Sequence, residues 1–85
     1  MIASHPHVKV LGRRECCLCE PVRAVVQQAA DQGLCTWEPV DVDRDKALLV
    51  RYGMDVPVVL VNGTERFRHR LEFGDLQKAL GEAVC

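Results

Sequence analysis

The sequence predicts an α/β fold, in which a four-stranded mixed sheet is covered by helices on both faces in the order βαβαββα. Two observations carry this prediction. In the first half, short β-branched apolar segments alternate with a segment of helical period, which is typical of a βαβ unit with parallel strands. In the second half, Asn62-Gly63 separates two strand-like segments and is a strong signal for a tight antiparallel hairpin.

The first predicted strand is Val8–Leu11, a brief apolar segment that ends at Gly12. Residues 1–7 show no periodicity and contain Pro6, so they are predicted to form a short tail. Residues 8–85 are then expected to form one domain, because 85 residues suffice for a single small core.

The first predicted helix runs over Cys17–Gln32 and is followed by Gly33 as a stop signal. Its apolar residues recur at the spacing of one helix face. They are Leu18, Val22, Val25, Val26, Ala29 and Ala30.

Four further elements are predicted after this helix. The second strand is Cys35–Val42, and Asp43 is expected to cap a short helix over Arg44–Tyr52. The third strand, Val56–Val61, is apolar on both faces, as expected of a central strand. The remaining elements are the fourth strand Thr64–Arg68 and a last helix Leu71–Leu80, which is expected to end at Gly81.

Composition excludes several classes of protein. The chain is 48% hydrophobic and 27% charged, which argues against disorder. Its net charge of −1 gives no basic field for nucleic acid or an anionic membrane surface. The longest apolar run, Val56–Val61, is too short for a membrane span or a signal peptide. We therefore expect a cytoplasmic monomer that binds neither nucleic acid nor membrane.

The cysteines are the most informative residues. There are five, an odd number without an export signal, which argues against a structural disulfide scaffold. Cys16, Cys17 and Cys19 cluster where a loop is predicted to become a helix. The free N–H groups and the dipole of a helix start stabilise a thiolate, and Arg14 adds positive potential nearby. Cys16 is the expected nucleophile and Cys19 the expected resolving thiol of a dithiol pair. Cys17 is expected to be dispensable for the exchange.

The sequence resembles the glutaredoxins and thioredoxins over about Val8–Leu80. The resemblance rests on Cys16-Cys17-Leu18-Cys19-Glu20 at a helix start and on Val56-Pro57 before a strand and hairpin. It implies a thioredoxin-like, glutaredoxin-type fold and a cis Val56–Pro57 bond whose backbone pairs with substrate. The expected substrate-binding residues are Arg14, Cys17, Leu18, Val56 and Pro57.

The resemblance implies a dithiol–disulfide oxidoreductase acting on a protein disulfide or a glutathione mixed disulfide. We expect no bound cofactor, with glutathione as a candidate reductant. The Gly-Gly-acidic signature for glutathione is absent, and the corresponding region reads Arg68-His69-Arg70-Leu71-Glu72-Phe73-Gly74-Asp75. Two alternatives stay open: a non-catalytic thioredoxin-fold binding module, and a metal or iron–sulfur module built on Cys16, Cys17 and Cys19.

Overall fold

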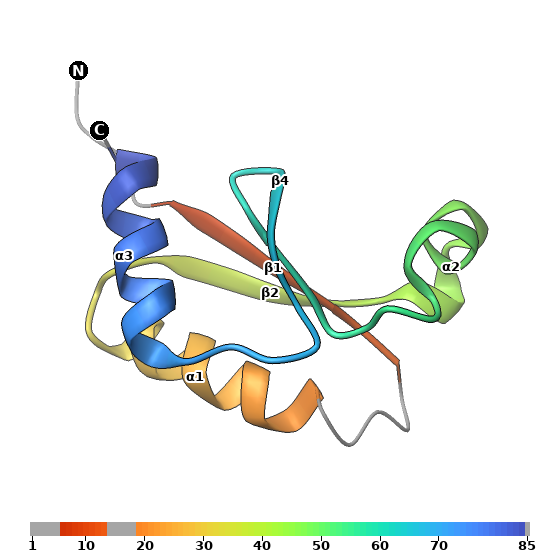
Figure 1. Cartoon of the computed structure of the whole chain (residues 1–85), viewed down its shortest axis with the longest axis horizontal. Coiled ribbons are helices and arrows are strands. Elements are labelled where there is room, and N and C mark those ends of the chain that lie inside the picture. Colours follow the sequence, from red (N-terminus) through yellow and green to blue (C-terminus); the bar gives the residue numbers. More distant parts are fainter. Residues whose placement is uncertain (1–5, 14–18, 85) are drawn as a thin grey trace.

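The computed structural model describes residues 6–13 and 19–84, and the side chains of residues 83 and 84 are not described. The elements follow the predicted order (Figure 1), with one additional short 3-10 turn before the second helix. They are β1 (His7–Gly12), α1 (Cys19–Asp31), β2 (Thr36–Asp41), η1 (Val42–Arg44), α2 (Lys46–Tyr52), β3 (Val58–Val61), β4 (Thr64–Arg68) and α3 (Phe73–Val84).

The four strands form one mixed sheet in the order β2-β1-β3-β4. β1 pairs with β2 in parallel across the α1 crossover, and it pairs with β3 antiparallel. β3 returns into β4 through Asn62-Gly63, where both residues have positive φ (52° and 84°), as a type I′ turn requires. The predicted α/β architecture with a mixed sheet is confirmed.

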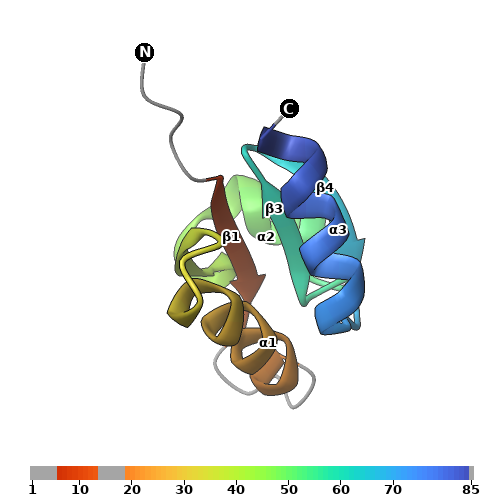
Figure 2. The same cartoon turned by 90° about the vertical axis from the view of Figure 1, so that its left-hand side faces the viewer.

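Side chains of the two central strands alternate between two cores. Val8 and Val10 of β1 and Val59 of β3 face the larger core, which α1 and α3 cover. Leu11 of β1 and Val58 of β3 face the opposite way, into a smaller core. That smaller core also receives Leu48, Leu49 and Tyr52 from α2. In Figure 2, α1 and α3 lie on one side of β1 and β3, and α2 lies behind these strands.

The start of the second helix differs from the prediction. Asp45, and not Asp43, caps α2: its carboxylate accepts hydrogen bonds from the N–H groups of Ala47 and Leu48 at 3.0 and 3.3 Å. Asp41 in turn accepts from the N–H of Asp43 and begins the 3-10 turn η1. Alternating aspartates thus offered several caps, and the chain uses two of them in succession.

Other boundaries also shift. β1 begins at His7, which the sequence placed in the tail, because the N–H of His7 donates to Asn62 Oδ1 at 2.9 Å and its C=O accepts from the Asn62 N–H. β3 begins at Val58, two residues later than predicted. α3 runs through the predicted stop at Gly81 to Val84. A glycine can continue a helix, at a cost of about 1 kcal/mol relative to alanine.

The predicted stop at Gly33 is confirmed: α1 ends at Asp31, and Gly33, two residues later, has φ at +77°. The N–H groups of Gly33 and Leu34 close the helix end on the carbonyls of Ala30 and Ala29. Within the residues that the structure describes, no helix is long and apolar enough to cross a membrane.

Candidate functional site

Cys19 is the first described residue of α1, and its side chain is fully buried. It is disulfide-bonded, and its partner lies outside the described residues. Arg14, Cys16, Cys17 and Leu18, which the sequence also assigned to the site, lie outside the described residues as well. The structure therefore places one of the two expected catalytic thiols.

The Val56–Pro57 segment lies at the same end of the sheet as Cys19. Leu11 of β1 pairs with Val58 of β3, so the end of β1 and the segment before β3 meet at one edge. The Val56–Pro57 peptide bond is cis, as the resemblance implied. Pro57 is buried and its carbonyl accepts a hydrogen bond from the His69 N–H at 2.7 Å, whereas Val56 is half-buried. Cys19 and the Val56–Pro57 segment thus lie at one end of the domain.

Gly12 and Arg23 belong to this region, although the sequence analysis gave neither a role there. A Cβ built on Gly12 would lie 2.8 Å from Cys19 Sγ and 2.9 Å from Arg23 Nη2. Glycine at this position therefore allows the sulfur and the guanidinium to approach the end of β1. The signal in the sequence is weak, because a glycine after a strand is more commonly interpreted as a turn.

We expect a Gly12→Ala variant to be destabilised by about 1–3 kcal/mol, the usual cost of overpacking a filled site. The added methyl group would meet the short, buried Cys19 side chain, which has little freedom to move away. Urea denaturation of the oxidised protein measures the effect. Gly74→Ala is the matched control, since nothing lies within 4 Å of a Cβ there. Equal stability of the two variants would contradict the assignment.

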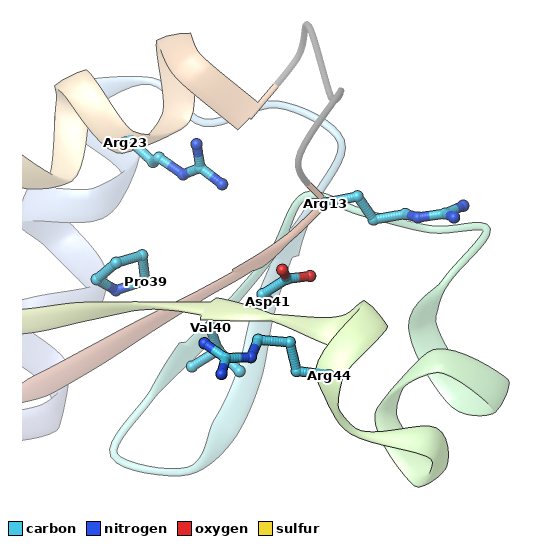
Figure 3. A pocket seen from close by; sticks show the side chains of 6 residues that line it. All are labelled: Arg13, Arg23, Pro39, Val40, Asp41 and Arg44. Carbon is cyan, nitrogen blue, oxygen red and sulfur yellow. The ribbon is translucent and has the colours of Figure 1, made fainter.

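A basic pocket of about 390 Å³ opens beside Arg23 (Figure 3). Its lining comes from α1, the residue that follows β1, the last residues of β2, and η1. The lining residues are Arg13, Arg23, Pro39, Val40, Asp41 and Arg44. Arg13 Nε also lies 3.1 Å from a carboxylate oxygen of Asp43. Three guanidinium groups against one lining carboxylate leave the pocket positively charged.

Asp55 joins the segment before Pro57 to the end of β4. Its carboxylate lies 2.9 Å from Arg68 Nη1 and 3.8 Å from His69 Nε2. Arg68 also pairs with Glu65, whose pKa is lowered by that hydrogen bond. His69 therefore faces an acidic partner, and Arg70 is exposed. No pattern in the sequence distinguishes Asp55 from the other surface acids.

Cys35 is a buried free thiol, and burial raises its pKa. A thiol in this environment stays protonated and unreactive at neutral pH. It packs in the larger core as a small apolar residue. Among the described residues, no group of three His, Cys, Asp or Glu side chains is arranged to hold a metal ion.

The fold and the position of Cys19 define a thioredoxin-like domain with a cysteine at the start of its first helix. The chain matches the glutaredoxin-like domain family (DUF836) over residues 7–81, and it belongs to this family. No curated protein matches it.

Three of the solved structures that match this chain illustrate the shared fold. A structural genomics target protein from X. campestris is 24% identical, with a TM-score of 0.73 and coverage of 88% of this chain and 96% of that one. A mutant thioredoxin from Halobacterium salinarum is 20% identical, with a TM-score of 0.73 and coverage of 96% and 77%. A protein from Nitrosomonas europaea is 22% identical, with a TM-score of 0.78 and coverage of 94% and 96%. At these identities the likeness establishes the thioredoxin-like fold alone.

Proposed function

We propose that the protein is a dithiol–disulfide oxidoreductase, with Cys16 as the nucleophile and Cys19 as the resolving thiol. The observation that carries the proposal is the position of Cys19: buried, disulfide-bonded and at the start of α1, at the same end of the sheet as Val56 and Pro57. Membership of the glutaredoxin-like family supports the same chemistry.

The proposed reaction has two exchange steps. The Cys16 thiolate attacks a substrate disulfide, forms a mixed disulfide and expels one substrate thiolate. The Cys19 thiolate then attacks the Cys16 sulfur, closes the Cys16–Cys19 disulfide and releases the second substrate thiol. Two equivalents of a cellular monothiol, or one dithiol, then reduce the protein disulfide and leave as a disulfide. The buried Cys19 suits the second role, because a thiol shielded from solvent reacts more readily with its neighbour than with external disulfides.

The proposed substrates are protein disulfides and glutathione mixed disulfides. Arg14, Cys17, Leu18 and Val56 are the proposed contact residues, and the buried Pro57 belongs to the proposed site as the residue that follows Val56. The reductant is glutathione, a monothiol, or a separate dithiol protein, and no resident metal takes part. We further propose that this reaction takes place in the cytoplasm, where the surrounding thiol pool regenerates a reduced dithiol.

The test is to trap the intermediate with a Cys19→Ser variant. Without the resolving thiol, the mixed disulfide at Cys16 has no internal route to resolution and should accumulate. Mass spectrometry of the non-reduced protein after exposure to a glutathione mixed disulfide or a cell extract measures the adduct and locates it. We expect an adduct on Cys16 in most of the protein.

The matched control is the double variant Cys16→Ser/Cys19→Ser, which retains Cys17, Cys35 and Cys85 and should form no stable adduct at the motif. An adduct on Cys17 in both variants would overturn the assignment of the nucleophile. No adduct in the single variant, together with no turnover of any disulfide by the unmodified protein, would overturn the proposed function.

A further inference from the structure

Arg23 has a buried polar atom without a hydrogen-bond partner among the described residues. It lies on α1 one turn after Cys19, is half-buried, and its Nε has no hydrogen-bond partner in the described part of the chain. Other arginines have carboxylate partners: Arg13 pairs with Asp43, and Arg66 pairs with Glu82 at 2.6 Å. A buried guanidinium atom without a partner is unfavourable unless a negative charge compensates it.

The sulfur of Cys19, once its disulfide is reduced, is an anionic group within reach of Arg23. Arg23 Nη2 and Cys19 Sγ lie 2.9 and 2.8 Å from one shared point, the position of a Cβ on Gly12. The distance between Arg23 Nη2 and Cys19 Sγ is therefore less than about 6 Å, the range over which an opposite charge acts on an ionisable group. An opposite charge within about 4–6 Å favours the charged form of an ionisable group.

The other charged groups around Arg23 do not cancel its attraction for a thiolate at Cys19. Arg13, Asp41 and Arg44 line the pocket beside it. Asp41 is the one carboxylate of the lining, and it already accepts a hydrogen bond from the N–H of Asp43. Glu20, the neighbour of Cys19 on α1, is exposed, so solvent screens its charge.

We propose that the Arg23 guanidinium stabilises the thiolate that Cys19 becomes when its disulfide opens, and that Gly12 is the residue that allows this contact. The inference rests on the proposed function for its catalytic meaning. Arg23 is then a positioning residue that acts through the Cys19 sulfur and does not touch the substrate.

The chemical consequence concerns the leaving group. In the reductive step, an external thiolate attacks Cys16 and forms a new sulfur–sulfur bond, and the electron pair of the broken Cys16–Cys19 bond stays on Cys19 as a thiolate. A thiolate of lower pKa leaves faster. Burial alone raises the pKa of a thiol, so without Arg23 the buried Cys19 would be a poor leaving group.

The experiment titrates Cys19 directly. In a reduced Cys16→Ser protein with ¹³Cβ-labelled cysteine, NMR follows the Cys19 carbon as a function of pH, with Arg23 retained or changed to Gln. We expect Arg23→Gln to raise the Cys19 pKa by about one unit, a tenfold smaller ionisation constant. In the protein with both motif cysteines, the same change should slow opening of the disulfide by dithiothreitol several-fold.

Two matched variants separate charge from packing. Arg23→Lys keeps the charge and should restore at least half of the pKa change. Arg44→Gln removes an equal charge from the same pocket, but Arg44 does not lie next to Gly12 and Cys19. This variant should therefore shift the Cys19 pKa far less. Thermal unfolding of each variant records any loss of stability.

An unchanged Cys19 pKa in Arg23→Gln, or an equal change in Arg44→Gln, would overturn the inference. The titration needs no substrate, so its result is independent of turnover. A protein that shows the Arg23-dependent pKa but exchanges no disulfide would refute the proposed function and leave the electrostatic contact standing.

Discussion

A Cys16→Ser variant is expected to lose disulfide exchange by a factor on the order of 10³ or more, because a thiolate is the nucleophile and a serine hydroxyl stays protonated at neutral pH. The loss should appear in turnover of both a glutathione mixed disulfide and a small protein disulfide. Cys19 remains in this variant, but its sulfur is fully buried, so it should not replace Cys16 in attacking an external substrate.

Cys17→Ser is the matched control, since it removes a neighbouring thiol by the same change. We expect it to retain most of the activity. Both variants should melt at nearly the same temperature when each is compared in the reduced state. If Cys17→Ser were the inactive variant and Cys16→Ser the active one, the nucleophile would be Cys17, and the spacing to Cys19 would be that of a Cys-X-Cys motif.

A Leu76→Ala variant is expected to lose about 2–5 kcal/mol of unfolding free energy, the usual cost of removing a buried leucine side chain. Leu76 lies on α3, is fully buried, and packs in the larger core between α1, α3 and the sheet. A domain of 85 residues holds roughly 4–13 kcal/mol in total, so this single change removes a large fraction of its stability. Urea denaturation monitored by circular dichroism measures the loss.

Val50→Ala on α2 serves as the control, because the Val50 side chain is 83% exposed and its truncation leaves no cavity. We expect its unfolding free energy to stay within about 0.5 kcal/mol of the unmodified protein. A Leu76→Ala protein as stable as Val50→Ala would show that α3 does not close the larger core as described.

Much of the fold could be predicted from local patterns. The alternation of strands and helices, the Asn62-Gly63 turn and the helix stop at Gly33 depend on short-range chemistry that neighbouring residues express directly. The predicted start of the second helix was wrong because several residues offered equivalent capping signals. Three aspartates in alternation, Asp41, Asp43 and Asp45, offered alternative caps, and the backbone geometry after β2 selected among them.

The predicted end of α3 at Gly81 was also wrong. Gly81 is an ordinary helix stop in the sequence, but the helix continues past it to Val84. One contact near this end is an ion pair between Arg66 of β4 and Glu82 of α3, which also lowers the pKa of Glu82. This pairing joins residues far apart in the chain, so no local pattern indicates it.

The sequence by itself determined the class of fold and the two motifs of the site, because helix periodicity, turn chemistry and the spacing of cysteines are local properties. Only the tertiary structure decided that Gly12, Cys19 and Arg23 meet at one point. That contact depends on how α1 packs against the end of β1. Packing is set by the summed burial of many residues in both cores, and therefore no single segment of the sequence encodes it.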